Sequence, residues 1–268
     1  MRNFLKYNIF NKSVGGLKMI HSFLLIGQSN MAGRGFLADA ENVDFKGLKV
    51  LRNGRWETMF RPVNPDRGFS GVNLAESFAE LYAKKYGVQV GIIPCADGGT
   101  SLDQWSVGGL LYDHAVYQAR LASRTSTIAG VLWHQGEADC APTPASTYRA
   151  RFEKVMESFR RDLDLYDVPF LLGGLGDFLA DCTLAANLKY YPLVNDALRD
   201  IAANNAMTGF VSAEGLGANP DNLHFNAKAL YEFGHRYFDE FEKLRDPNKV
   251  FEEKPGVDNA IRTAMELL

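Results

Sequence analysis

Five short apolar segments recur along the chain and predict the strands of one sheet. Near-continuous apolar runs cover residues 21–27, 88–94, 128–135 and 168–175, and a weaker run covers residues 208–213. Apolar content without polar alternation is typical of strands that are buried on both faces, as in a parallel sheet. The pattern therefore predicts a mainly parallel sheet of five strands.

Amphipathic patterns with helical spacing lie between these runs. Each pattern repeats an apolar residue every three or four positions, which gives one apolar stripe for packing against a sheet. The patterns occur in residues 72–86, in residues 147–163 and between Leu230 and Phe241. Strands and helices that alternate in this way predict an α/β fold, a three-layer α/β/α sandwich with right-handed crossovers.

The segments outside this alternation give the expected domain boundaries. Residues 19–245 are expected to form the domain, and residues 36–70, rich in Gly, Pro, Asn and Arg, a long irregular connection within it. Residues 1–18 form an N-terminal extension in which basic residues interrupt every apolar patch. This is unlike a signal peptide and predicts a cytoplasmic protein, although a different translation start would leave secretion open. Residues 246–268 form a turn-rich tail whose last stretch, "VDNAIRTAMELL", predicts a short peripheral helix.

Composition narrows the classes of partner. The chain is 46% hydrophobic and 23% charged, with a formal net charge of -3. These values are ordinary for a globular protein and give no reason to expect nucleic acid or a membrane as a partner. The three cysteines, Cys95, Cys140 and Cys182, show neither a disulfide framework nor the spacing of a zinc site. We therefore expect no metal.

Polar residues follow four of the predicted strands, at the edge where open α/β sheets bind their ligands. The first strand is followed by "GQSNMAGRG", the second by "CADGGTSLDQW", the third by "WHQGEADC" and the fifth by "NPDNLHF". The glycines after the first strand match neither the P-loop nor the dinucleotide fingerprint, because Ala32 and Ala38 occupy positions where these motifs need glycine. This disfavours a nucleotide-binding regulator.

Ser29, in the first of these segments, is a candidate nucleophile. A lone serine after a strand is more often a helix N-cap, and the G-x-S-x-G elbow of α/β-hydrolases is absent because Met31 replaces its second glycine. The segment "DNLH" supplies the missing partners, because Asp221 stands three residues before His224. This spacing allows the carboxylate to hold Nδ1–H while Nε2 faces the serine. Their position after the last strand favours a Ser-His-Asp triad.

Acyl transfer also needs hydrogen-bond donors for an oxyanion. Gly98 and Gly99 allow backbone N–H groups close to a substrate, since glycine adds no side chain. The segment with Gln135 and Glu137 offers an amide side chain and a polar cluster. Each segment alone would be an ordinary turn, but the four segments together predict an esterase site.

The same segments resemble the SGNH/GDSL hydrolase superfamily, in particular its carbohydrate-esterase branch. That branch includes acetylxylan esterases of carbohydrate esterase family six and sialate O-acetylesterases. "GQSNM" and "WHQGE" together are highly specific, and the resemblance runs from about Ser22 to about Leu244. It implies a flavodoxin-like fold, with Ser29 as the nucleophile and Asp221 and His224 completing the triad.

The resemblance also implies an oxyanion hole and substrate contacts. The N–H groups of Ser29 and of Gly98 or Gly99 are expected to hold the oxyanion. Gln135 is expected to provide the side-chain donor that the wider superfamily takes from an asparagine. A second set of side chains lies beside the motifs and is expected to contact the substrate: Gln28, Arg34, Trp105 and Glu137. A buried aromatic is the alternative interpretation of Trp105.

These expectations define a serine esterase that removes O-acetyl groups from a carbohydrate through an acyl-enzyme. The expected substrate is an acetylated xylo-oligosaccharide or an O-acetylated sialic acid, and the chemistry requires neither a metal nor an organic cofactor. Two alternatives stay open. The same triad would serve a lipid or another small acyl ester, and a relative without catalysis would only bind a glycan.

Overall fold

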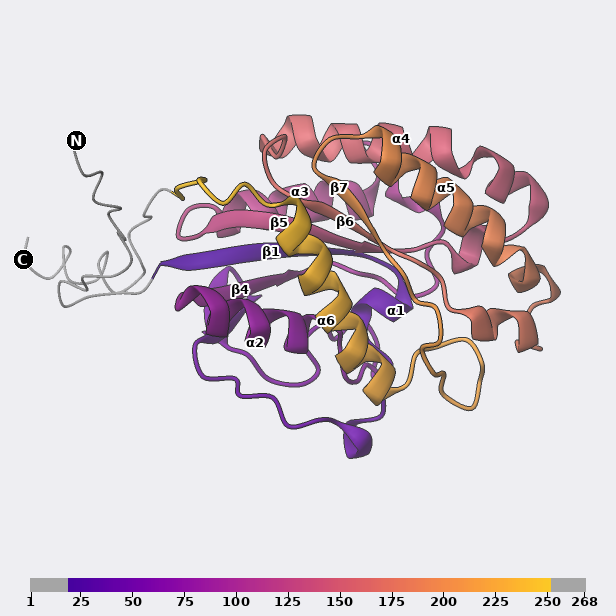
Figure 1. The fold of residues 1–268 in the computed structure, drawn as a ribbon, viewed down its shortest axis with the longest axis horizontal. Helices are drawn as coiled ribbons and strands as arrows, with labels where there is room; N and C mark the ends of the chain where they lie inside the picture. Colours follow the sequence, from indigo (N-terminus) through magenta and orange to yellow (C-terminus); the bar gives the residue numbers. More distant parts are fainter. Residues whose placement is uncertain (1–18, 252–268) are drawn as a thin grey trace, which may run out of the picture.

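The computed structural model describes residues 19–251, in which a seven-stranded sheet lies between two layers of helices (Figure 1). The strand order is β3-β2-β4-β1-β5-β6-β7, and all neighbours are parallel except β2 and β3. The strands are β1 (Ile20–Gly27), β2 (Leu48–Arg52), β3 (Arg55–Thr58), β4 (Gln89–Pro94), β5 (Thr127–His134), β6 (Phe170–Gly173) and β7 (Thr208–Val211). The α-helices are α1 (Ser29–Ala32), α2 (Ala75–Tyr86), α3 (Leu110–Ala122), α4 (Pro142–Leu163), α5 (Tyr191–Asn204) and α6 (Ala227–Leu244).

The five predicted strands correspond to β1, β4, β5, β6 and β7, and their order is flavodoxin-like. Numbered 1 to 5 along the chain, these strands lie in the order 2-1-3-4-5. The predicted three-layer α/β/α fold is thus confirmed. The connections reverse direction between β1 and β5, and sheets of this order bind ligands at that point, beyond the carboxyl ends of the strands.

The sheet has two strands more than the sequence pattern predicts, so the expected number of five is wrong. Both additional strands, β2 and β3, lie in residues 36–70, which the composition had marked as irregular. Asn53 and Gly54 join them with positive φ angles of 49° and 74°. Two such residues form the tight turn that matches the twist of a hairpin. The fully buried side chains of Leu48 and Val50 anchor β2 beside β4.

Three of the helices match the predicted amphipathic patterns, and the described residues contain three more. α2, α4 and α6 are the predicted helices, whereas the short α1 and the longer α3 and α5 have no counterpart in the prediction. The stripe that α3 buries combines Tyr112 and Val116 with three alanines, Ala115, Ala119 and Ala122, so large apolar side chains do not recur along it as they do in the predicted helices. The predicted N-terminal extension and the predicted C-terminal peripheral helix lie outside the described residues.

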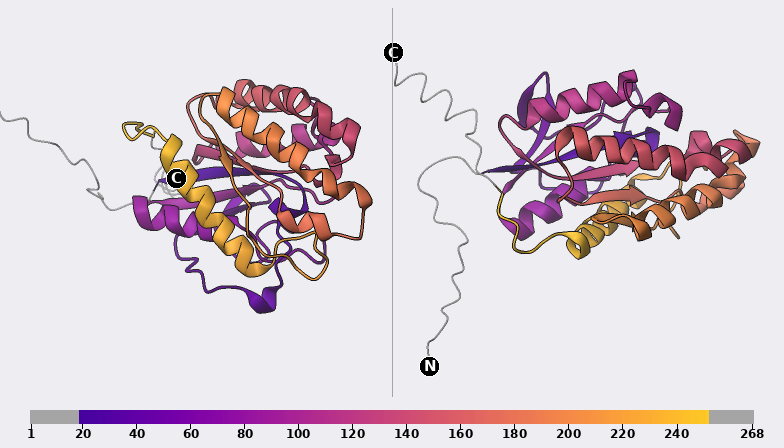
Figure 2. Two further views of the ribbon diagram at one scale, coloured as in Figure 1. Left: turned by 45° about the vertical axis from the view of Figure 1, so that its right-hand side comes forward. Right: turned by 90° about the horizontal axis from the view of Figure 1, so that it is seen from above.

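The two layers of helices cover opposite faces of the sheet (Figure 2). α2 and α6 lie together on one face, and α3, α4 and α5 cover the other. Side chains of β1 alternate between these layers. Phe23 and Leu25 belong to the core under α2 and α6, whereas Leu24 and Ile26 belong to the core on the other face. β1 is therefore central in the sheet and buried from both sides.

The contact between α2 and α6 depends on Gly234. A Cβ atom at this position would lie 2.1 Å from Oγ of Ser77 and 2.2 Å from the carbonyl oxygen of Leu74. Relieving such an overlap typically costs about 1–3 kcal/mol, against a gain in helix propensity of about 1 kcal/mol. We expect Gly234→Ala to lower the free energy of unfolding by up to about 2 kcal/mol in chemical denaturation. The control Asp239→Ala, on the exposed face of α6, should stay within about 0.5 kcal/mol of the parent. An unchanged denaturation midpoint for Gly234→Ala would show that α2 and α6 can move apart without a loss of stability.

Candidate active site

Ser29 begins α1 directly beyond the end of β1, where that strand lies beside β5. Gly27 pairs with His134 at the ends of these strands, and the φ angle of Gly27 is 135°. A Cβ atom on Gly27 would lie 2.0 Å from the carbonyl oxygen of His134, so glycine is required for this approach. The chain then enters a four-residue helix, and its first residue, Ser29, lines a cavity at the sheet edge.

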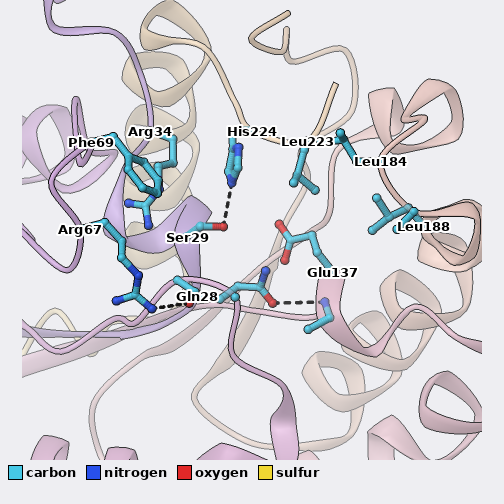
Figure 3. A pocket seen from close by; sticks show the side chains of 14 residues that line it. Gln28, Ser29, Arg34, Arg67, Phe69, Glu137, Leu184, Leu188, Leu223 and His224 are labelled. Atoms are coloured by element: carbon cyan, nitrogen blue, oxygen red, sulfur yellow. Dashed lines mark hydrogen bonds between the residues drawn. The ribbon is translucent and has the colours of Figure 1, made fainter. Parts of the chain in front are cut away.

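Ser29, His224 and Asp221 form a chain of hydrogen bonds. Nε2 of His224 lies 3.0 Å from Oγ of Ser29 (Figure 3), and Nδ1 of His224 lies 2.7 Å from Oδ2 of Asp221. With Nδ1–H donated to the carboxylate, Nε2 carries the lone pair that can accept the serine proton. The structure thus brings together the three residues that the sequence predicts as a triad.

The carboxylate of Asp221 also shapes the turn that carries His224. Its Oδ1 accepts hydrogen bonds from the backbone N–H groups of Leu223 (2.9 Å) and His224 (3.0 Å). Partial burial raises the pKa of Asp221, but the hydrogen bonds from the His224 ring and from these two N–H groups outweigh it and lower the pKa below its ordinary value. The carboxylate is therefore ionised at neutral pH.

Asn30 connects the serine helix to the histidine turn. Its Oδ1 accepts a hydrogen bond from the N–H of Phe225 (3.1 Å). Its Nδ2 donates to the carbonyl oxygen of Leu223 (3.1 Å) and to Oε1 of Glu137 (2.5 Å). The sequence prediction missed this positioning residue, although it directly follows the candidate nucleophile. Its short amide side chain fixes the distance between Ser29 and the turn that carries the imidazole.

Gly98 and Gly99 line the cavity beside Ser29, but their N–H groups differ in availability. The N–H of Gly98 donates to Oδ2 of Asp66 at 2.8 Å. Within residues 19–251, the N–H groups of Ser29 and Gly99 have no hydrogen-bond partner. The sequence left the choice between the two glycines open, and the structure favours Gly99 as the available donor.

Arg34 and Asp66 form a buried ion pair that supports the Gly98 turn. The Nη atoms of Arg34 donate to the two carboxylate oxygens at 2.9 Å and 2.7 Å, and each side chain is 4% exposed. Burial raises the pKa of Asp66, but hydrogen bonds from Arg34, Ser70 and Gly98 lower it below its ordinary value. Arg34 lines the cavity, where its charge is neutralised by Asp66, and its predicted contact with the substrate stays a prediction.

Gln135 and Trp105 do not reach the cavity, contrary to their predicted roles. Both side chains are fully buried. Nε2 of Gln135 donates to the carbonyl oxygen of Thr100 (3.1 Å) and to Oδ2 of Asp139 (2.7 Å), which uses both N–H groups of the amide. Nε1 of Trp105 donates to Oγ1 of Thr100 at 3.1 Å. The structure therefore contradicts Gln135 as the oxyanion donor, and Trp105 is the buried aromatic of the alternative interpretation.

Gln28 and Glu137 line the cavity from the ends of β1 and β5 (Figure 3). Oε1 of Gln28 accepts hydrogen bonds from the N–H groups of Gly136 (3.3 Å) and Ala138 (3.4 Å). Oε2 of Glu137 has no hydrogen-bond partner among the described residues, and Oε1 lies 3.7 Å from Nδ1 of His134. Burial lowers the pKa of His134, so that imidazole is neutral beside the carboxylate.

The cavity over Ser29 has a volume of about 390 Å³ and combines polar and apolar walls. Leu184, Leu188 and Leu223 form an apolar side, which the sequence reasoning missed. Phe69 lines the cavity as well. Leu184 is 66% exposed and Phe69 is 72% exposed. These residues come from connections between the main elements, where no periodic pattern indicates which side chains will meet.

The described part of the chain shows neither a metal cluster nor a membrane span. Within residues 19–251, no group of three or more His, Cys, Asp and Glu side chains could hold a metal ion. No helix in the same range is both long and apolar enough to cross a bilayer. The three cysteines are buried and unpaired.

The sheet order, together with a Ser-His-Asp arrangement at its carboxyl edge, defines the class of SGNH-like carboxylic ester hydrolases. A family model described as "Carbohydrate esterase, sialic acid-specific acetylesterase" matches residues 19–243, and the chain belongs to this family. Membership supports O-acetyl esterase activity.

Similar proteins agree with this family and fold. The chain is 28% identical over 235 residues to the probable carbohydrate esterase At4g34215 of Arabidopsis thaliana, across 79% of this chain and 86% of that protein. The X-ray structure of the Arabidopsis protein aligns with a TM-score of 0.74 and 25% identity, over 84% of this chain and 98% of that chain. The carbohydrate acetylesterase XAC1771 of Xanthomonas citri aligns with a TM-score of 0.63 and 21% identity, over 84% of this chain and 56% of that one. NanS aligns with a TM-score of 0.67 and 18% identity, over 86% of this chain and 98% of that chain. The last two share the fold.

Proposed function

We propose that the protein removes O-acetyl groups from an acetylated carbohydrate, with Ser29 as nucleophile, His224 as general base and acid, and Asp221 as the residue that orients His224. The family supports the acetylesterase activity. The observation that carries the residue roles is the 3.0 Å separation between Nε2 of His224 and Oγ of Ser29, two residues that line the same cavity.

The proposed reaction has two halves that share one imidazole. In the first, Nε2 of His224 takes the hydroxyl proton while Oγ of Ser29 attacks the acetyl carbonyl. The N–H groups of Ser29 and Gly99 donate to the oxyanion. His224 then protonates the leaving sugar oxygen, and the acetyl group remains on Ser29. In the second half, His224 deprotonates a water molecule, which attacks the acyl-enzyme and releases acetate.

Two classes of acetylated carbohydrate are the proposed substrates: O-acetylated sialic acid and acetylated xylo-oligosaccharide. Sialic acid is favoured by the description of the family, and xylo-oligosaccharide by the resemblance of the "GQSNM" and "WHQGE" motifs to acetylxylan esterases. We expect acetate release from at least one of the two, measured by an enzyme-coupled acetate assay beside 4-nitrophenyl acetate as an activated reference. Hydrolysis of the reference ester alone would contradict a carbohydrate substrate. Sugar binding without hydrolysis of any ester would instead support a glycan-binding protein.

A second candidate function is favoured by the apolar wall of the cavity. Leu184, Leu188 and Leu223 offer a surface that an acyl chain longer than acetyl could bury. The discriminating measurement is kcat/KM on the 4-nitrophenyl esters of acetate, butyrate and octanoate. A decrease with chain length supports the acetyl ester, in which case the leucines contact the alcohol part of the substrate. An increase with chain length would replace the proposed substrate by a lipid or a small acyl ester.

A further inference from the structure

We propose that the side-chain amide of Gln28 provides the oxyanion donor that the sequence pattern assigns to Gln135, and that Gln135 instead braces the loops beneath the cavity. The inference rests on the proposed function in one respect, namely that Ser29 is the nucleophile. It gives Gln28 a direct part in the reaction, beyond a contact with the sugar.

The orientation of the Gln28 amide follows from its neighbours. Two backbone N–H groups, those of Gly136 and Ala138, approach the same end of the amide at 3.3 Å and 3.4 Å. Since N–H groups face an acceptor, that end is the carbonyl oxygen, and the NH₂ group occupies the opposite end. Gln28 is thus held in one of its two possible flip states by contacts with the backbone of the loop that follows β5.

The NH₂ end of Gln28 is available to a substrate. Gln28 lines the cavity together with Ser29, Gly99 and His224, and Figure 3 shows its nitrogen directed into the cavity, between Ser29 and Glu137. Nε2 has no hydrogen-bond partner within residues 19–251 and is not among the side-chain atoms that are buried without one. It therefore retains donors that can serve a developing negative charge beside Ser29.

Gln135 is occupied at every polar atom of its side chain. Both N–H groups are donated, to the carbonyl oxygen of Thr100 and to Asp139, and Oε1 (3.0 Å) shares the hydroxyl proton of Tyr148 with the backbone carbonyl oxygen of Gln135 (2.9 Å). Asp139 in turn accepts a hydrogen bond from the N–H of Leu102 at 2.8 Å. Donation to an oxyanion would require these buried bonds to break, at the full cost of leaving their partners unsatisfied.

Two substitutions of Gln28 test the donor. Gln28→Glu keeps a carboxylate oxygen for the N–H groups of Gly136 and Ala138 but removes the donor. Gln28→Met keeps the length of the side chain without adding charge. For both variants we expect kcat on 4-nitrophenyl acetate to fall by about 10²–10³-fold, the usual effect of losing one oxyanion donor. KM should change less than about threefold, because the donor acts on the transition state.

The matched control is Gln135→Met. It removes the hydrogen bonds that the Gln135 side chain makes with Thr100, Asp139 and Tyr148, so we expect a lower Tm. The kcat of the folded protein should stay within about tenfold of the parent. The inference is overturned if both Gln28 variants keep kcat within about threefold of the parent. It is also overturned if Gln135→Met loses about 10²–10³-fold in kcat at an unchanged Tm, since that is the effect of a donor.

Labelling by a fluorophosphonate separates this inference from the choice of substrate. Oγ of Ser29 would displace fluoride at phosphorus, its proton would pass to His224, and the phosphoryl oxygen would occupy the oxyanion hole. If the parent protein is labelled at Ser29 but releases no acetate from carbohydrates, the proposed substrate is wrong. Slower labelling of the Gln28 variants would still support the inference, and unchanged labelling would overturn it. Absence of labelling at Ser29 would overturn both proposals.

Discussion

Ser29→Ala is expected to lower kcat for acetyl ester hydrolysis by about 10⁴–10⁶-fold, the range found when a serine nucleophile is removed from a triad. The substitution deletes only the hydroxyl that lies 3.0 Å from Nε2 of His224. The N–H of residue 29 and the other donors of the cavity remain. Substrate therefore still binds, but no acyl-enzyme can form, and KM should change far less than kcat. Acetate release at saturating substrate measures the loss.

The fold should survive this substitution, because the serine hydroxyl makes its hydrogen bond at the cavity and not in either core. Thermal unfolding is expected to show a Tm close to that of the parent, which separates lost chemistry from lost structure. Ser146→Ala, at an exposed position of α4, is a matched control for the loss of a hydroxyl. Near-parental turnover of Ser29→Ala on any acetyl ester would show that another group attacks the carbonyl.

The sequence predicted the central strands because each is buried on both faces and therefore apolar along its whole length. β3 lacks this signal: none of its side chains is buried, and Trp56 is only partly covered. The information that could have identified β3 is local instead. Asn53-Gly54 follows the apolar residues of β2 and is the strongest short signal for a hairpin. The high overall content of Gly and Pro in residues 36–70 obscured this hairpin signal.

The proximity of Ser29, His224 and Asp221 could be predicted from sequence because two simple rules place these three residues. Asp221 and His224 share one short turn, and Ser29 follows a central strand, so the carboxyl edge of a parallel sheet brings them together. Gln135 shows the limit of the same reasoning. Its position after β5 could be predicted, but the direction of its amide depends on Asp139 and Thr100, whose contacts form only in the folded chain.

Asp221→Asn is expected to lower kcat by about 10⁴-fold, although it preserves the shape of the side chain. The amide oxygen can still accept the N–H groups of Leu223 and His224, which Oδ1 holds in the parent. The amide NH₂ then faces Nδ1 of His224, so Nδ1 becomes an acceptor and the ring proton moves to Nε2. An Nε2 that carries a proton cannot accept one from Ser29. Nitrogen-15 NMR of His224 measures this tautomer directly, beside acetate release.

The same substitution also predicts a change in the dependence of stability on pH. The native hydrogen bonds lower the pKa of Asp221, so the carboxylate stabilises the fold above its unfolded pKa of ~3.9. That contribution is lost as the pH falls through the lower native pKa, whereas the neutral asparagine has none to lose. The acid-induced decrease in Tm should therefore be smaller for Asp221→Asn than for the parent, and Asp196→Asn, at an exposed position of α5, should retain the parental profile. If Asp221→Asn showed the smaller decrease but kept kcat within about tenfold of the parent, the carboxylate would brace the turn without controlling the tautomer of His224.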